Sequence, residues 1–142
     1  MKFHEFTVDD TFFTDEVHMT KEKIIEFAQA YDPQFLHTDE EAAKEGPYGS
    51  ITASSFHVLI AVWSEFIKMD ILGEDSRGSL GVDKIQWQGP VRPGDTLTGI
   101  FKVINIKEIT DKTRGIVSLE ATILNQRGQE VVKGKIEVFA AV

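Results

Sequence analysis

The segment TASSFHVLIAVWSEFIKMDIL, residues 52–72, decides the fold. Its apolar residues recur at helical spacing, which predicts a long helix that ends before Gly73. The apolar positions cover more than a narrow stripe of that helix: Phe56, Leu59, Ile60, Val62, Trp63, Phe66 and Ile67. A helix that is apolar over so much of its surface is wrapped by other elements, so we expect it at the centre of the molecule.

The second half of the chain is rich in β-branched residues and predicts extended strands. Four long runs are separated by short turn sequences: residues 79–88, 96–109, 114–125 and 129–140. Two short extended pieces are expected within residues 3–18, broken at Asp9-Asp10. Because short connections favour antiparallel pairing, we expect an α+β protein with the hot-dog fold, in which a curled antiparallel sheet of four to six strands wraps one long central helix. Open edge strands invite pairing with a second copy, so we also expect a homodimer or a higher homo-oligomer.

The region before the central helix predicts two shorter helices. Thr20 is a suitable cap for a helix that ends at Tyr31 or Asp32, because Pro33 disfavours helical backbone in the residue before it. Thr38, with Glu41 three residues later, matches a capping box and predicts a second short helix.

Length, charge and composition limit the class of protein. The chain has 142 residues, which predicts a single domain over residues 1–142. Lysine and arginine number 15 against 23 acidic residues, a formal charge of −8 that disfavours nucleic acid and anionic membranes as partners. We find no secretory signal and no apolar run long enough to span a membrane, so we expect a soluble, cytoplasmic protein. The absence of cysteine excludes disulfides, thiolate metal sites and a cysteine nucleophile.

The segment Tyr31-Asp32-Pro33-Gln34-Phe35-Leu36-His37 brings a carboxylate and an imidazole into one loop between two predicted helices. Aspartate and histidine together are suited to moving protons near neutral pH, which makes Asp32 and His37 candidate catalytic residues. The alternative is that Asp-Pro and a histidine near a helix cap serve only the turn.

The segment Gly49-Ser50-Ile51-Thr52-Ala53-Ser54-Ser55-Phe56-His57 leads into the central helix and is rich in small residues. Small side chains leave the N–H groups of the first helical turn uncovered, and such groups attract negative charge. They would stabilise an oxyanion or enolate that forms beside them. The alternative is that each serine or threonine here is simply a helix cap.

Taken together, these segments resemble the MaoC-like dehydratases, also called (R)-specific enoyl-CoA hydratases, which have the hot-dog fold. The hydratase motif of that family runs approximately Asp-x-Asn-Pro-Leu-His, with an Asp-Pro-Gln version, and is similar to residues 32–37. A later family stretch of the type Gly-Gly-x-Ile-Ala-Ser-Gly-Trp-His is similar to residues 49–57. The segment Trp87-Gln88-Gly89-Pro90-Val91-Arg92-Pro93-Gly94-Asp95-Thr96-Leu97 resembles the Pro-Val-Arg-Pro-Gly-Asp connection of the family. The three matches occur in order over roughly residues 20–100.

The resemblance implies reversible syn addition of water across the trans-2,3 double bond of an acyl thioester. Asp32 and His37 would hold and activate the water, and the backbone N–H of Ser55 would contact the thioester oxygen. The resemblance implies no bound cofactor, with coenzyme A or acyl carrier protein entering as the carrier of the substrate. The sequence departs from the family pattern at Gln34, Phe35 and Ser55, and Ser54-Ser55 stands where many members have His-Gly.

Five further residues are candidates for substrate binding: Tyr31, Tyr48, Ser54, His57 and Arg92. Arg92 is a candidate for a coenzyme A phosphate, whereas His57 is alternatively a partly buried helix residue with one satisfied nitrogen. One histidine with nearby acids lacks the convergent ligands of a metal site, so we expect no metal. Two other functions stay open: an acyl-CoA thioesterase, and a non-catalytic hot-dog subunit that binds acyl groups.

Overall fold

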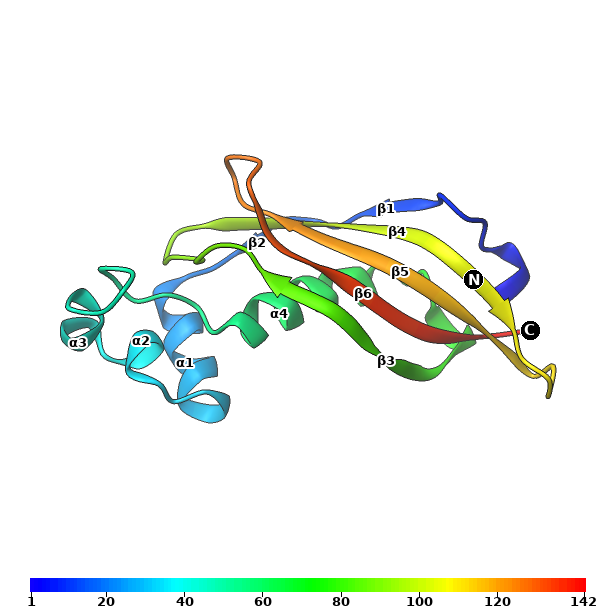
Figure 1. Ribbon diagram of the computed structural model, residues 1–142, viewed down its shortest axis with the longest axis horizontal. Helices are drawn as coiled ribbons and strands as arrows, with labels where there is room; N and C mark the ends of the chain where they lie inside the picture. The colour runs from blue at the N-terminus through cyan, green and yellow to red at the C-terminus, as the bar shows by residue number, and fades with distance from the viewer.

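Helix α4 (Ser55–Lys68) lies against a curled antiparallel sheet in the computed structural model, which describes residues 1–142 (Figure 1). Val58, Val62 and Phe66 are buried on one side of α4 because they recur every four residues. Gly99 on a facing strand lets the helix approach closely, since a Cβ there would lie 2.4 Å from Cγ1 of Val62. The sheet therefore covers one side of α4, while other apolar residues of the helix stay exposed.

The helix is shorter at both ends than the predicted range of 52–72. The N–H groups of Thr52 and Ala53 donate to the carbonyl oxygens of Leu36 and Val91, at 3.0 and 2.8 Å, and these bonds hold the segment extended. At the other end, Asp70 adopts a left-handed φ of 60°, which a helix cannot continue. Both boundaries depend on contacts or backbone angles that apolar periodicity does not report.

All strands of the sheet pair antiparallel, which confirms the predicted α+β hot-dog fold. The strand order is β1-β4-β5-β6-β3, with β2 also pairing with β4, so β3 is an edge strand. The strands are β1 (Thr11–Phe13), β2 (Val17–His18), β3 (Ser76–Trp87), β4 (Thr96–Glu108), β5 (Arg114–Leu124) and β6 (Glu130–Ala141). The four long strands lie within a few residues of the predicted runs.

The prediction for residues 3–18 is wrong in its details. Phe3–Glu5 forms a 3-10 helix, η1, and both short strands follow Asp10 instead of flanking it. The side chain of Phe3 is buried, which favours a compact turn over an extended strand at this point. Asp9 has a φ of 79°, and the Asp9 N–H donates to the carbonyl oxygen of Val103 at 2.8 Å. The two aspartates therefore turn the chain onto the sheet before β1 begins.

Three helices gather at one end of the elongated molecule: α1 (Lys21–Tyr31), α2 (Phe35–Thr38) and α3 (Glu40–Lys44) (Figure 1). Thr20 caps α1 by accepting from the Lys23 N–H at 3.2 Å, as predicted. The predicted cap at Thr38 is wrong, because Asp39 caps α3 and the Thr38 hydroxyl donates to the Gln34 carbonyl.

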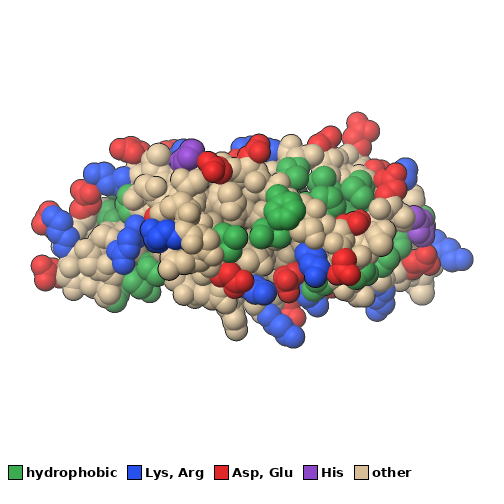
Figure 2. All heavy atoms as spheres, turned by 90° about the horizontal axis from the view of Figure 1, so that it is seen from above, with side chains coloured by type: hydrophobic (Ala, Val, Ile, Leu, Met, Phe, Trp, Pro, Cys, Tyr) green, Lys and Arg blue, Asp and Glu red, His purple; other side chains and the backbone are tan.

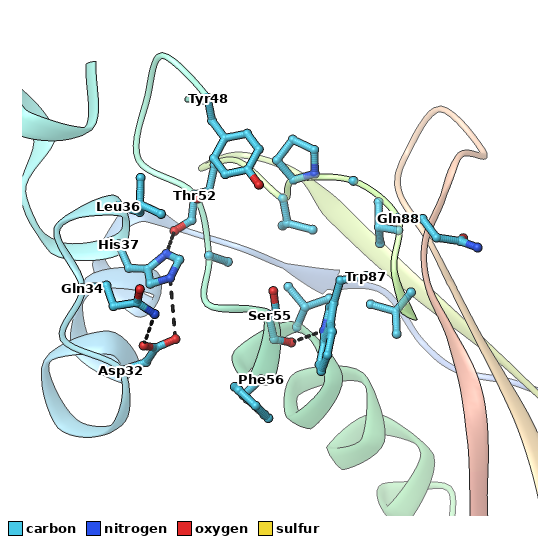
Figure 3. A pocket seen from close by; sticks show the side chains of 17 residues that line it. Asp32, Gln34, Leu36, His37, Tyr48, Thr52, Ser55, Phe56, Trp87 and Gln88 are labelled. Carbon is cyan, nitrogen blue, oxygen red and sulfur yellow. Dashed lines mark hydrogen bonds and ion pairs between the residues drawn. The ribbon is translucent and has the colours of Figure 1, made fainter. Parts of the chain in front are cut away.

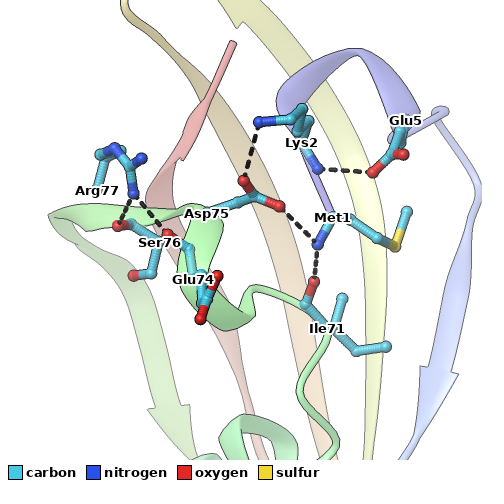
Figure 4. A network of polar contacts seen from close by, with 8 residues as sticks. All are labelled: Met1, Lys2, Glu5, Ile71, Glu74, Asp75, Ser76 and Arg77. Atoms are coloured by element: carbon cyan, nitrogen blue, oxygen red, sulfur yellow. Dashed lines mark hydrogen bonds and ion pairs between the residues drawn. The ribbon is translucent and has the colours of Figure 1, made fainter.

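The opposite end of the molecule is held by a polar network around Asp75 (Figure 4). The Asp75 carboxylate lies 3.5 Å from the N-terminal ammonium of Met1 and 3.2 Å from Nζ of Lys2. The hydrogen bond from Lys2 is the main reason that the pKa of Asp75 lies below its usual value. The network ties η1 to the 3-10 helix η2 (Gly73–Asp75), where the chain enters β3.

On the face drawn in Figure 2, acidic and basic side chains are interspersed along the length of the molecule, and apolar side chains gather right of centre. No helix is long and apolar enough to cross a membrane.

Candidate active site

A cavity of about 520 Å³ lies where α2, the start of α4 and the end of β3 meet (Figure 3). Asp32, His37, Tyr48 and Ser55 line it, so four of the predicted site residues share one space. Nine of the 17 lining residues are hydrophobic, which suits an apolar chain beside a polar reaction centre.

Asp32 and His37 point toward each other across the loop that joins α1 and α2 (Figure 3). Oδ2 of Asp32 lies 3.6 Å from Nε2 of His37. Asp32 is the residue that ends α1, and Pro33 turns the chain so that α2 carries His37 back over it. The short loop thus holds both side chains at one point, as the residue pattern predicts.

The hydrogen bonds of His37 define which ring nitrogen is free. Nδ1 lies 2.6 Å from the carbonyl oxygen of Thr52, and a carbonyl oxygen only accepts, so Nδ1 carries a proton. In the neutral ring Nε2 therefore keeps its lone pair and faces Asp32. His37 is 7% exposed, so the ring is fixed in this orientation by burial as well as by the bond.

Two short hydrogen bonds keep Asp32 in its ionised form. Nε2 of Gln34 donates to Oδ1 and the Ser54 hydroxyl donates to Oδ2, both at 2.7 Å. The bond from Gln34, followed by that from Ser54 and by the charge of His37, lowers the pKa of Asp32. Since a carboxylate accepts about four hydrogen bonds, Asp32 retains sites for a water or substrate group.

Ser55 and Phe56, in the first turn of α4, line the cavity. The N–H groups of Ser55, Phe56 and His57 have no hydrogen-bond acceptor, as expected for the start of a helix. Nε1 of Trp87 donates to the Ser55 carbonyl at 2.8 Å and so ties this turn to β3 (Figure 3). The helix start is therefore a rigid group of donors, with partial positive charge from the helix dipole.

The other predicted substrate-binding residues, Tyr31, Ser54, His57 and Arg92, do not line this cavity. Ser54 is fully buried at the N-cap position of α4, but its hydroxyl bonds Asp32 instead of capping the helix, and it does not line the cavity. Tyr31 is exposed and packs on Phe27. Arg92 lies in a neighbouring cavity and donates to the carbonyl oxygen of Tyr48 and to the Ser50 hydroxyl.

His57 is a buried residue of α4 and does not line the cavity, which favours the alternative of a helix residue over a substrate-binding one. Its ring stacks on Phe27 with centroids 4.4 Å apart, and its buried Nδ1 has no hydrogen-bond partner. Burial lowers the pKa of His57, and the charge of Lys23 lowers it further. The ring is therefore neutral at pH 7.

Sequence reasoning missed three groups of the site: the Gln34 side chain, the Thr52 carbonyl and Trp87. Gln34 was considered only as a departure from a motif, although a side-chain amide just after Asp-Pro can reach back to the aspartate. The other two depend on chain segments that meet only in the folded protein. No group of three His, Asp or Glu side chains is arranged to hold a metal ion.

Comparison with known proteins supplies independent information. The family model described as "MaoC like domain" matches residues 5–125. The chain is 30% identical over 139 residues to YdeM, an uncharacterized protein of Bacillus subtilis, and the match covers 98% of each chain. It is 26% identical over 102 residues to 3-hydroxyacyl-thioester dehydratase Z of Mycobacterium tuberculosis, covering 70% of this chain and 68% of that protein. The crystal structure of the MaoC-like dehydratase from Rhodospirillum rubrum is similar with a TM-score of 0.90 and 29% identity, covering 99% of this chain and 97% of that one.

Proposed function

The chain belongs to the MaoC-like domain family, and on this premise we propose that it adds water reversibly to the double bond of a trans-2-enoyl thioester. The observation that carries the proposal is the meeting of an ionised Asp32 and Nε2 of His37, 3.6 Å apart, beside the N–H groups of α4 that have no acceptor. This set provides a base, a fixed negative charge and an oxyanion site within one cavity.

His37 is the proton carrier in this proposal. In hydration, the oxygen of a bound water attacks the β-carbon while its proton moves to Nε2, the ring nitrogen that keeps a lone pair. The electrons of the double bond move onto the thioester oxygen and give an enolate. Nε2 then returns the proton to the α-carbon on the same face, which gives syn addition and restores the neutral ring. Dehydration follows the same steps in reverse.

Asp32 orients the water and stabilises the transient imidazolium. Its lowered pKa makes it a poor base but keeps it negative, at 3.6 Å from the nitrogen that becomes protonated. Gln34 and Ser54 each use one carboxylate oxygen, so they fix the direction of the remaining lone pairs. A water held between Oδ2 and Nε2 is thereby aimed into the cavity.

The N–H of Ser55 is the proposed donor to the thioester oxygen. The negative charge that develops on this oxygen in the enolate strengthens its bond to a preoriented N–H, and the helix dipole adds to the effect. Glycine is usual here in the family, but the donor is a backbone group, so a serine supplies it as well. Tyr48 and the apolar lining residues would surround the acyl chain.

The thioester carrier, coenzyme A or acyl carrier protein, enters as part of the substrate in this proposal. No covalent intermediate and no resident cofactor are needed, because the proton and the water account for every bond formed.

We further propose a homodimer across β3 and the adjoining side of α4. Leu80 and Val82 on the β3 edge are 52% and 61% exposed, and Phe56 and Ile60 on α4 are 60% and 52% exposed. An edge strand flanked by an apolar helix face favours pairing with a second copy. Phe56 also lines the cavity, so the second copy would close the active site.

The test is hydration of crotonyl-CoA, followed through the loss of the absorbance of the conjugated thioester. We expect turnover by the wild type and a fall in kcat of about 10²- to 10⁴-fold in His37→Gln, the usual contribution of general base catalysis. Asp32→Asn should lower kcat with the fold retained, whereas Ser64→Ala, on α4 and outside the site, should not change it. Full turnover in His37→Gln would remove His37 from the mechanism.

The two alternative functions predict different products. A thioesterase releases a free thiol, which a disulfide reagent detects, whereas hydration leaves the thioester intact. A non-catalytic subunit would bind acyl-CoA in calorimetry but turn over no chain length. Either result would replace the hydratase proposal.

A further inference from the structure

A second cavity, of about 430 Å³, adjoins the active site. It shares Gln88, Gly89, Pro90 and Val131 with the first cavity, so the two are neighbours along the segment that follows β3. The second cavity is mainly polar, because only one of its nine lining residues is hydrophobic. An acyl chain belongs in the first cavity, and a polar group belongs in the second.

Two arginines line the second cavity, and neither has a carboxylate partner within 4.0 Å. Arg92 uses Nη1 to bond the Tyr48 carbonyl and the Ser50 hydroxyl, at 2.7 and 2.6 Å. A guanidinium has five N–H donors, so Nη2 and Nε of Arg92 remain available. Arg127 uses only Nε, which donates to Oε1 of Gln129 at 3.2 Å. Both guanidinium groups keep free donors for an anion.

The turn that carries Arg127 is rigid. Oδ1 of the buried Asn125 accepts from the N–H groups of Arg127 and Gln129, at 2.9 and 3.1 Å. Gly128 supplies the positive φ, 75°, that this turn requires. The position of Arg127 is thus fixed by the β5–β6 turn and does not depend on a flexible loop.

The local charge contrasts with that of the whole molecule. Among the lining residues, Arg92 and Arg127 face one carboxylate, Glu130, which leaves this cavity positive in a chain whose formal charge is −8. Gln88, Asn125 and Gln129 add uncharged hydrogen-bonding groups. Such a site is suited to a phosphate ester rather than to a cation or an apolar group.

We propose that the second cavity binds the phosphate at the end of the pantetheine arm of the substrate, with Arg92 and Arg127 as its ligands. The inference rests on the proposed function, because it takes the thioester to be held in the first cavity. Coenzyme A and the prosthetic arm of an acyl carrier protein share this phosphate, and both enter through the same neighbouring space. Arg92 also joins two loops of the fold, so Arg127 is the residue that tests the proposal.

The experiment measures binding by calorimetry with 4′-phosphopantetheine and with pantetheine, which lacks the phosphate. We expect the wild type to bind the phosphorylated compound at least fivefold more tightly. Arg127→Gln should lose roughly fivefold to tenfold in affinity for 4′-phosphopantetheine and nothing for pantetheine, because it removes one charge-assisted contact. The control Lys107→Gln removes one positive charge from the far part of β4 and should change neither the affinity for 4′-phosphopantetheine nor that for pantetheine. Equal losses in both variants, or no preference for the phosphate, would overturn the proposal.

Two further measurements separate this proposal from the proposed function and identify the carrier. Binding needs no turnover, so Arg127-dependent binding without hydration of any crotonyl thioester would reject the function and keep the phosphate site. If crotonyl-pantetheine and crotonyl-CoA are hydrated equally efficiently, and Arg127→Gln changes neither rate, the phosphate site is rejected and the proposed function is kept. Arg127→Gln should raise KM for both crotonyl-CoA and crotonyl-acyl carrier protein, and the substrate with the larger kcat/KM is the carrier.

Discussion

Replacing Ser54 by alanine tests whether the orientation and charge of Asp32 matter to catalysis. The Ser54 hydroxyl donates to Oδ2 of Asp32 at 2.7 Å, the oxygen that faces His37. Ser54 precedes α4, but its side chain makes no capping hydrogen bond, so Ser54→Ala removes no support from the helix. The substitution therefore changes one hydrogen bond to a charged group and leaves the fold intact.

The magnitude follows from the nature of that bond. A hydrogen bond to a charged group contributes about 1.5–3 kcal/mol, and each 1.36 kcal/mol in the barrier is tenfold in rate. If the bond holds Asp32 in its working direction, kcat should fall about tenfold to a hundredfold, with KM little changed. The loss of a donor also raises the pKa of Asp32, because Ser54 is one of the groups that lower it.

The assay is steady-state hydration of crotonyl-CoA between pH 4 and 9, with thermal unfolding measured alongside. Ser64→Ala is the matched control, since it removes a serine hydroxyl from α4 that makes no hydrogen bond. An unchanged kcat in a folded Ser54→Ala protein would refute the role given to Asp32. Equal falls in both serine variants would point to a general effect on α4 instead.

Substitutions at three other residues give further predictions. Trp87→Phe removes the donor to the Ser55 carbonyl at 2.8 Å; we expect kcat to fall up to about tenfold with the melting temperature retained, measured by steady-state kinetics. His57→Phe keeps the stacking on Phe27 and removes a buried, unpaired Nδ1, which costs about 1–3 kcal/mol, so Tm should rise by several degrees in a thermal scan. Burial lowers the pKa of His57 below 6.5, so as the pH drops the unfolded chain takes up a proton on this histidine before the folded chain does. The stability of the wild type should therefore fall as the pH drops below 6.5. Urea titrations should show a weaker fall for His57→Phe. Val82→Lys, at a position 61% exposed on the edge of β3, should halve the mass found by light scattering, and an unchanged mass would exclude pairing through this strand.

The fold could be predicted because its signals are local. The long strands are β-branched runs between turn residues, and their bounds depend on neighbours in sequence. Thr20 and Pro33 set the ends of α1 through their own chemistry, with no help from distant residues. Asp39 caps α3 in place of the expected Thr38 because aspartate is the better N-cap of the two adjacent residues and α2 extends through Thr38.

The parts of the site that could not be predicted join segments that are far apart in the chain. Ser54 and Asp32 are separated by 22 residues, and Trp87 and Ser55 by 32. The residue pattern around Ser54 or Trp87 does not indicate which distant residue its side chain will contact. The sequence predicts the side chain of Ser54 near the substrate, whereas in the structure its hydroxyl bonds the carboxylate of Asp32.

The late start of α4 links the fold to the proposed chemistry. A helix beginning at Thr52, as the apolar pattern indicates, would use the Thr52 carbonyl and the Ser55 N–H in its own backbone bonds. Instead, bonds from Thr52 and Ala53 to the carbonyl oxygens of Leu36 and Val91 hold the segment extended. The Thr52 carbonyl is then free to fix the tautomer of His37, and the Ser55 N–H is free for an oxyanion. The same few hydrogen bonds that shorten the helix therefore shape both the proposed base and the proposed oxyanion site, and apolar periodicity alone does not report them.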